Sequence, residues 1–318
     1  MATVTAQMVK ELREMTLAGM SDCKKALDAA EGDMDKAVVI LREKGLASAA
    51  KKASRAASEG VVSTVVDNNN LGFVFEVNCE TDFVTKNDGF QAFVSNLHNI
   101  INSAKPADLD ALLATNYDVS GNVKDAATAL VAQIGENITV RRFARVGSGK
   151  NFVTSYVHGG GKIGVVVELA GSGIEAHLNN QGLIELGKDV ALQAAAMKPQ
   201  FLNEQEIPAE TIKQEEEIIR NKFLQQGKPE AALAKIVPSS IKTWFKEICL
   251  VDQLFVKDDS KSVAAYVSEV GKKLGINDLK VTSFIRLELG QGVEKKAEDF
   301  AAEVAATVAA TVAAAAKG

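Results

Sequence analysis

The sequence feature that most constrains the fold is an internal repeat. Residues 61–77 align without gaps with residues 153–169, which lie 92 positions further along the chain. In each copy, a run of β-branched residues is followed by a turn rich in Asn or Gly and then by a second apolar run. This pattern is typical of a β-hairpin. The chain is therefore predicted to contain two hairpins of the same kind, each in a structural unit of its own.

The repeat continues beyond the hairpins. Residues 134–141 end the first half much as residues 274–286 end the second, with a helix pattern, a glycine and then a strand pattern. Each half reads as strand, strand, helix, helix, strand, which predicts an α+β unit with a three-stranded antiparallel sheet covered by helices. We expect an N-terminal subdomain over residues 55–146 and a C-terminal subdomain over residues 147–290 to pack together as one core.

An N-terminal helical domain is predicted over residues 1–54. Three stretches there place apolar residues on one helical face, which indicates a small three-helix bundle of the ubiquitin-associated type. Ser21 and Asp33 are the predicted N-caps of the second and third helices, and Gly45 is predicted to end the third. The Ala-rich, basic stretch 47–57 is predicted to form a separate linker helix.

The second half contains an insertion, residues 204–250, in which apolar residues recur at alternating spacings of three and four. This pattern predicts an antiparallel coiled-coil hairpin that projects from the core. Because Pro238 lacks the N–H that a continuous helix needs, we expect the second arm to break near Val237 and restart. The last residues, 291–318, are rich in Ala, which favours a C-terminal helix.

Composition limits the classes of function. With 318 residues and 47% hydrophobic content, the chain is long enough for more than one domain with a substantial core. A net charge of -5 argues against a general nucleic-acid-binding protein, whose binding domain would be strongly basic. Widely spaced cysteines without a CxxC pair favour neither a disulfide framework nor a zinc site. Since the pattern of a signal peptide or a membrane span is also missing, we expect a reduced, cytoplasmic protein without metal or cofactor.

The ligand motifs do not support an enzyme. Residues 147–151 and 159–163 superficially resemble phosphate-binding loops, but both lack the earlier glycine and the Ser or Thr that would bind magnesium. No spacing argues for a histidine, a carboxylate and a nucleophile acting together, so an acyl- or phosphotransferase has no candidate site. An RNA-associated adaptor is an alternative function, because a basic patch of Lys51, Lys52 and Arg55 follows the N-terminal helices.

The stretch 78–87 directly follows an apolar run, residues 71–77, that is predicted to be a buried strand. One interpretation is a strand-to-helix corner in which Thr81 or Asp82 caps the next helix and Phe83 lies in the core. The other makes Phe83 an exposed apolar wedge beside a carboxylate, because partner proteins are typically held by such aromatic anchors. The residue types alone do not decide between the two.

One combination of sequence blocks is shared with a known family. It consists of residues 20–27, 77–84, 134–142, 156–160 and 284–286. In this order the blocks resemble bacterial translation elongation factor Ts, the guanine nucleotide exchange factor of elongation factor Tu. The resemblance implies a protein that binds elongation factor Tu in its GDP-bound and nucleotide-free states. It would promote GDP release so that GTP can bind during translation elongation, without a membrane and without a stably bound nucleic acid.

The resemblance also implies which residues disturb the magnesium site of elongation factor Tu. They are four consecutive residues: Thr81, Asp82, Phe83 and Val84. They would enter near the magnesium ion, displace neighbouring side chains of the GTPase and loosen the ion.

Other positions match partner-binding residues of the family. They are Arg13, Met20, Lys24, Ile134, Gly135 and His158. The first five would contact the nucleotide-binding domain of elongation factor Tu, and the histidine would face another of its domains. For Met20, an ordinary hydrophobic staple is an equally good interpretation. Ser21 stands where relatives often carry a second methionine, so this contact is expected to be weaker.

Overall fold

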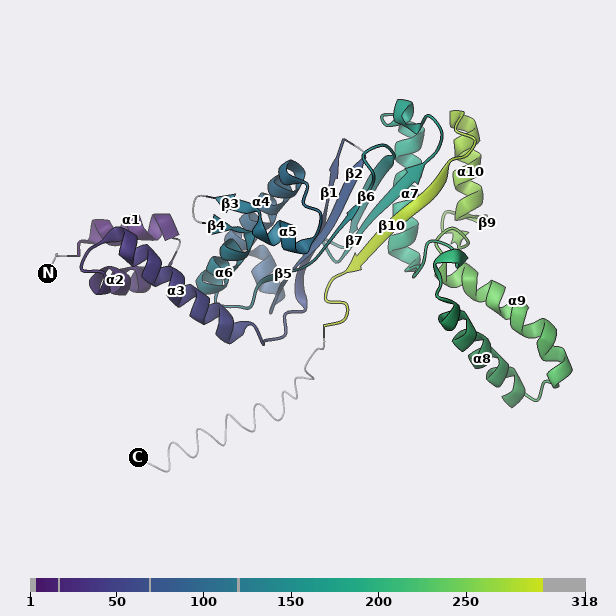
Figure 1. Ribbon diagram of the computed structural model, residues 1–318, viewed down its shortest axis with the longest axis horizontal. Coiled ribbons are helices and arrows are strands. Elements are labelled where there is room, and N and C mark those ends of the chain that lie inside the picture. Colours follow the sequence, from purple (N-terminus) through teal and green to yellow (C-terminus); the bar gives the residue numbers. More distant parts are fainter. Residues whose placement is uncertain (1–3, 17, 69, 119–120, 294–318) are drawn as a thin grey trace.

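Two three-stranded antiparallel sheets form the centre of the protein (Figure 1). The computed structural model describes residues 4–16, 18–68, 70–118 and 121–293. The predicted C-terminal helix, from residue 294 onward, lies outside the described residues. The strands of the two sheets have the orders β1-β2-β5 and β10-β7-β6, so each hairpin of the repeat is completed by the strand that ends its half.

Each sheet belongs to one structural unit. The first unit contains β1 (Glu59–Asp67), β2 (Leu71–Cys79), α4 (Asp88–Ala104), α5 (Leu109–Ala114), β3 (Asn116–Asp118), β4 (Gly121–Asn122), α6 (Val123–Ile134) and β5 (Thr139–Val146). The second contains β6 (Phe152–His158), β7 (Ile163–Ala170), α7 (Gln181–Met197), β8 (Leu254–Phe255), β9 (Asp258–Ser262), α10 (Val263–Leu274) and β10 (Lys280–Glu288). The predicted α+β fold with a duplicated core is confirmed.

The two sheets pack face to face, and helices cover their outer faces. The contact between the sheets is aliphatic and consists of Val62, Val74, Val146, Val153, Val166 and Leu287. On the opposite side of β2, alternate residues Phe73, Phe75 and Val77 pack against the helices of the first unit. Since both faces of β2 are covered, the strand is buried along its whole length. This explains why its sequence is a nearly continuous apolar run.

One charged residue, Glu76, lies among these apolar contacts and is fully buried. Its carboxylate accepts hydrogen bonds from Arg142 Nε at 2.5 Å, from Arg141 at 3.4 Å and from the backbone N–H of Gly290 at 2.8 Å. Burying a carboxylate is costly unless cations and donors compensate for the lost water. The network therefore fixes the end of β10 against the first sheet.

The N-terminal bundle consists of α1 (Ala6–Thr16), α2 (Met20–Ala29) and α3 (Met34–Lys52). The predicted cap Asp33 is confirmed, since its carboxylate accepts the N–H of Lys36 at 3.0 Å. The predicted cap Ser21 is wrong. Helix α2 begins at Met20, two residues earlier than predicted, and Gly19 occupies the N-cap position without a side-chain hydrogen bond.

The prediction that Gly45 ends the third helix is also wrong, because α3 runs through it to Lys52. Gly45 is buried, and a Cβ built on it would lie 3.5 Å from the Cβ of Ala132 in α6. Arg42, one turn earlier, pairs with Asp125 at 2.9 Å. The packing of α3 against α6 therefore carries the helix through Gly45, and the predicted separate linker helix is the second half of α3.

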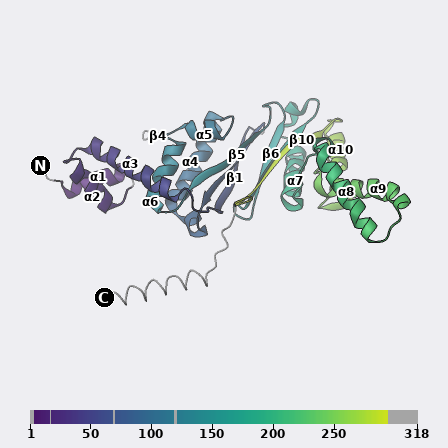
Figure 2. The same cartoon turned by 60° about the horizontal axis from the view of Figure 1, so that its bottom comes forward.

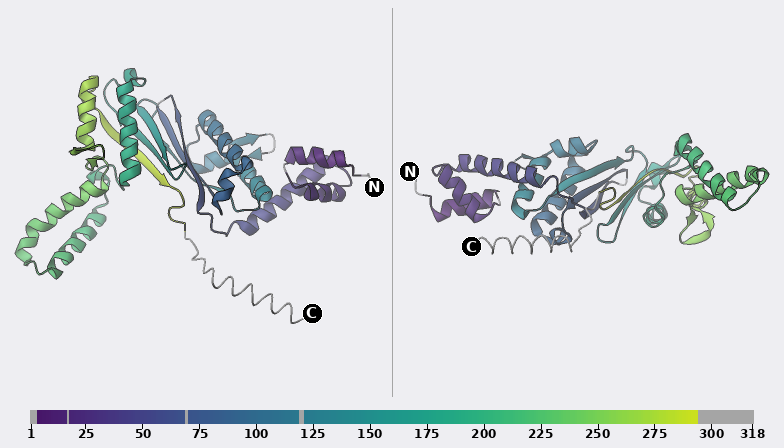
Figure 3. Two further views of the ribbon diagram at one scale, coloured as in Figure 1. Left: turned by 180° about the vertical axis from the view of Figure 1, so that it is seen from behind. Right: turned by 90° about the horizontal axis from the view of Figure 1, so that it is seen from below.

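The insertion forms the predicted helical hairpin, with α8 (Ala209–Gln225) and α9 (Glu230–Ile248). The hairpin projects from the second unit, at the opposite end of the molecule from the N-terminal bundle (Figures 2 and 3). The expected break near Val237 does not occur, because α9 continues through Pro238. An interior proline costs about 3 kcal/mol. Burying each of Leu233, Val237 and Ile241 against α8 contributes about 1.5–3 kcal/mol, which outweighs this loss.

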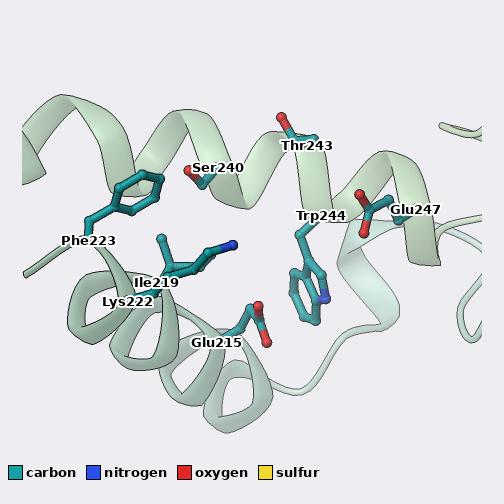
Figure 4. Close-up of a pocket in the computed structure, with 8 residues that line it drawn as sticks. All are labelled: Glu215, Ile219, Lys222, Phe223, Ser240, Thr243, Trp244 and Glu247. Carbon is teal, nitrogen blue, oxygen red and sulfur yellow. The ribbon is translucent and has the colours of Figure 1, made fainter. Parts of the chain in front are cut away.

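The packing between these two helices is incomplete. Ile219 and Phe223 of α8 and Trp244 of α9 point into the space between the helices (Figure 4). An open groove of about 260 Å³ remains there, bordered by the charged side chains of Glu215 and Lys222. The hairpin is thus held by a narrow apolar seam with polar borders.

Two helical glycines should respond oppositely to the same substitution. Gly45→Ala should raise the free energy of unfolding by about 0.5–1 kcal/mol, because the new methyl group meets Ala132 at an ordinary contact distance and alanine favours helix. Gly271→Ala in α10 should lower it by about 1–3 kcal/mol, because its Cβ would lie 2.6 Å from the carbonyl oxygen of Ile276. Urea denaturation of the two variants measures both effects. Destabilisation by Gly45→Ala would show that the contact with α6 has no room for a methyl group.

Candidate functional site

The candidate site is the corner at which the chain leaves β2 and enters α4. After Cys79 the chain passes through a short 3-10 helix, Asp82–Lys86, and Asn87 then caps α4 by accepting the N–H of Gly89 at 2.9 Å. Thr81 precedes the 3-10 helix, but its side chain makes no capping hydrogen bond. The predicted capping of the next α-helix by Thr81 or Asp82 is therefore wrong.

Phe83 is an exposed aromatic residue at this corner. Its exposed fraction is 78%, whereas its neighbour Val84 is only 6% exposed and belongs to the helix-covered core of the first unit. Since adjacent residues of the 3-10 helix point in different directions, anchoring Val84 in the core turns Phe83 toward water. The interpretation of Phe83 as a core residue is therefore wrong, and Asp82 lies exposed beside it.

Crossed hydrogen bonds fix the corner to the loop between α6 and β5. The carboxylate of Glu136 accepts the N–H of Glu80 at 3.1 Å and, from Thr81, both the N–H at 2.9 Å and the hydroxyl at 2.7 Å. In return, the carboxylate of Glu80 accepts the N–H of Asn137 at 2.6 Å. Arg55 pairs with Glu80 at 3.4 Å, and its carbonyl accepts the Asn137 amide at 2.8 Å. We refer to the contacts between residues 80–81 and 136–137 as the corner clamp.

The second unit contains a shorter version of the same clamp. Ser172 stands two residues after β7, as Thr81 stands two residues after β2. The carboxylate of Asp278, in the loop between α10 and β10, accepts the Ser172 N–H at 2.8 Å and its hydroxyl at 2.7 Å. These hydrogen bonds lower the pKa of Asp278. Here the apolar residue that follows, Ile174, is buried, so the clamp belongs to the repeat whereas the exposed aromatic residue belongs to the first unit.

Cys79 lies beneath the corner and is inert. Its thiol is buried and donates to the carbonyl of Thr81 at 3.1 Å. Burial, together with the nearby carboxylate of Glu136, raises the pKa of this thiol to about 12. A thiol with this pKa remains protonated at neutral pH and is a poor nucleophile. Its role is therefore to support the backbone of the corner.

The structure brings two of the predicted segments together. Ile134 is the last residue of α6, and Gly135 follows with φ of +91°. A Cβ built on Gly135 would meet no atom within 4 Å, so the backbone is accessible there. Because the corner clamp joins the next residue, Glu136, to Thr81, the segments around Ile134 and Phe83 form one continuous surface.

The other predicted residues lie apart from this surface. Arg13 and Lys24 are exposed on α1 and α2 of the N-terminal bundle. Met20 is 57% exposed and lies one helical turn from Lys24. His158 ends β6, where it is exposed and its ring nitrogen Nδ1 lies 3.0 Å from the hydroxyl of Tyr156.

Sequence reasoning did not assign the residues that hold the corner, Glu136 and Asn137. A signal was present, because a carboxylate directly after a helix-ending glycine is well placed to accept free backbone N–H groups. Two cations of the basic patch make contacts with other residues at the surface of the chain. Arg55 pairs with Glu80, and Lys52 donates to the Ser48 hydroxyl at 3.0 Å.

The comparisons with known proteins agree on one family. The family model described as "Elongation factor TS" matches residues 80–291. The chain belongs to the elongation factor Ts family. It is 46% identical over 299 residues to elongation factor Ts of Clostridium perfringens (strain ATCC 13124), covering 94% of this chain and 97% of the relative. It is 44% identical over 299 residues to that of Clostridium botulinum (strain Alaska E43), with the same coverage.

The corner clamp lies within the part that the family model matches. In the parts of the chain that the structure describes, no three side chains of His, Cys, Asp or Glu are grouped so that they could hold a metal ion. No helix in those parts is long and apolar enough to span a membrane.

The exposure of Phe83 predicts a small effect on stability. Phe83→Ala should change the free energy of unfolding by less than about 0.5 kcal/mol, because the ring already faces water. Phe90→Ala, a few residues away but 1% exposed, should lower it by about 3–5 kcal/mol. Urea denaturation of the free proteins measures both. Similar losses of unfolding free energy for the two variants would show that Phe83 is a core residue.

Proposed function

We propose that this protein is the guanine nucleotide exchange factor of elongation factor Tu. It binds the GDP-bound GTPase, inserts Asp82 and Phe83 near the magnesium site, and promotes GDP release so that GTP can bind. The observation that carries the proposal is the exposed Phe83, held beside a carboxylate by the corner clamp, in a chain of the elongation factor Ts family.

The rigidity of the corner supports this role. An exposed aromatic ring on a mobile loop would lose conformational entropy when it entered a partner. Here Glu136 accepts the two backbone N–H groups before Asp82, and Val84 is buried directly after Phe83. The wedge is therefore ordered before it meets its partner.

The wedge alone is too weak to account for exchange. A roughly 1,000-fold acceleration of nucleotide loss corresponds to about 4 kcal/mol. Burying one phenylalanine contributes about 1.5–3 kcal/mol. Other contacts must therefore hold the GTPase while Phe83 acts. We assign these contacts to Arg13, Met20 and Lys24 of the bundle, to Ile134 and Gly135 beside the corner, and to His158 on the second sheet.

The protein itself performs no covalent chemistry in this mechanism and is not an enzyme in the usual sense. Reciprocity requires that, if the factor weakens GDP binding, bound GDP weakens the binding of the factor by the same ratio. The complex is consequently stable with the nucleotide-free GTPase and transient in the presence of GDP. The RNA-associated adaptor is not proposed further, because the chain belongs to the elongation factor Ts family.

Substitution of Asp82 or Phe83 should affect the rate of nucleotide exchange more than the affinity for elongation factor Tu. Phe83→Ala and Asp82→Ala should each lower stimulated GDP release by about tenfold or more, because each removes a group that acts only when the magnesium site is disturbed. Binding to nucleotide-free elongation factor Tu should weaken less than the rate falls. Release of a fluorescent GDP analogue and a binding titration measure the two effects. Normal release with either variant would contradict the wedge assignment.

The two clamps provide a matched pair of substitutions. Glu136→Ala should lower stimulated GDP release, because Thr81 loses the acceptor that orients the wedge. Asp278→Ala removes the equivalent acceptor in the second unit and should leave release per folded molecule unchanged. Each variant loses a charged acceptor of a backbone N–H and a hydroxyl, so thermal melts of both variants check that their stabilities are matched. Equal loss of exchange activity in both would show that the clamps act only through stability.

A further inference from the structure

A groove beside the corner has no role in the mechanism above. It lies between α4, the start of β1 and the β6–β7 hairpin, and its volume is about 470 Å³. Helix α4 lines it with Gln91, Val94, Ser95 and His98, whose spacing of three and four places them on one helical face. We refer to it as the α4 groove.

The α4 groove connects two parts of the proposed interface. Thr85 of the 3-10 helix lines one part of it, and Gly160, two residues after His158, lines another. The hairpin that carries Gly160 is fixed against the first sheet, because the N–H of Val62 donates to the carbonyl of Gly161 at 2.7 Å. The groove is therefore part of one rigid surface that includes the corner and the hairpin.

The interior of the groove carries no formal charge. His98 lies 2.7 Å from the Ser63 hydroxyl through Nε2 and contacts the ring of Phe75 edge-on, with 5.3 Å between ring centroids. Burial lowers the pKa of His98, so the imidazole is neutral at pH 7. Val61 and Val94 add apolar surface. Such a lining accepts an apolar chain and excludes an isolated charge.

A hydroxyl group lies at the edge of the groove beside the corner. It belongs to Thr85 of the 3-10 helix, which lines the groove. This hydroxyl donates to the backbone carbonyl of Asp82 at 2.6 Å, so its oxygen can still accept a hydrogen bond. This edge of the groove therefore favours a hydrogen-bond-donating group.

We propose that the α4 groove binds a side chain of elongation factor Tu that has an apolar stem and a hydrogen-bond-donating head. The stem packs against Val61 and Val94, and the head reaches the hydroxyl of Thr85 at the edge of the groove. The groove thereby holds the GTPase between the points that Phe83 and His158 contact. This inference rests on the proposed function and makes the groove a determinant of affinity, whereas Phe83 determines the rate.

Filling the groove tests the proposal. Ser95→Trp places a large ring in the groove from an exposed helix position, and Ser103→Trp places the same ring on an exposed part of α4 outside the groove. Ser95→Trp should raise the concentration needed for half-maximal GDP release by about tenfold or more, with the maximal rate retained. Ser103→Trp should match the wild type. A lower maximal rate with unchanged half-maximal concentration, or equal effects of both variants, would overturn the proposal.

A second measurement does not depend on a bulky substitution. Ser95→Cys and Ser103→Cys add a thiol of nearly the same size, and the native cysteines are buried. Nucleotide-free elongation factor Tu should slow alkylation of the thiol at position 95 by iodoacetamide and leave position 103 unaffected. Equal rates of alkylation at position 95 with and without the GTPase would overturn the proposal. Slower alkylation at higher concentrations of this protein alone, without the GTPase, would overturn it as well.

The outcomes separate this inference from the proposed function. If the wild type accelerates GDP release but neither variant at position 95 responds, the groove proposal fails and the exchange function stands. If the wild type does not accelerate release at all, the exchange function fails. Protection of the thiol at position 95 by elongation factor Tu would then still establish the groove as its binding site.

Discussion

The corner clamp is the interaction on which the candidate site depends. Glu80 and Glu136 each use their carboxylate to bind backbone groups of the other segment, so neither segment can move without breaking charge-assisted hydrogen bonds. Such bonds are roughly twice as strong as neutral ones. Strand β2, fully buried between the second sheet and the helices of its own unit, supplies the rigid base. The exposed ring of Phe83 is thus supported by the most buried strand of the molecule.

A second polar network connects the same strand to the end of the described chain. Glu76 lies between the sheets and binds Arg141, Arg142 and the N–H of Gly290. The guanidinium group of Arg141 also donates to the carbonyl of Gln291 at 2.8 Å. The chain therefore leaves the core at a defined place, beside the first sheet. The two networks share β2, so the position of the corner and the position of this exit are set by one element.

Much of this arrangement follows from local sequence patterns. The hairpins and sheets were predictable because the repeat of residues 61–77 carries its turn chemistry and its alternation of faces within the sequence. The continuity of α3 through Gly45 and of α9 through Pro238 was not predictable. Local preference disfavours helix at both positions, and packing against α6 or α8 overrides it. The exposure of Phe83 was undecided for the same reason, because the burial of Val84 depends on a core assembled from distant segments.

Because both units contain the clamp, the residue displayed at the corner can change in evolution without loss of the fold. Thr81 and Ser172 are held in the same way, although an exposed aromatic residue follows one and a buried aliphatic residue follows the other. Folding of the corner therefore does not depend on the side chain that the corner displays. In this duplicated architecture, both units retain the clamp. The residue that follows it can differ between them, as Phe83 and Ile174 do. Selection can thus adjust the displayed residue to a new binding partner without rebuilding the scaffold beneath it.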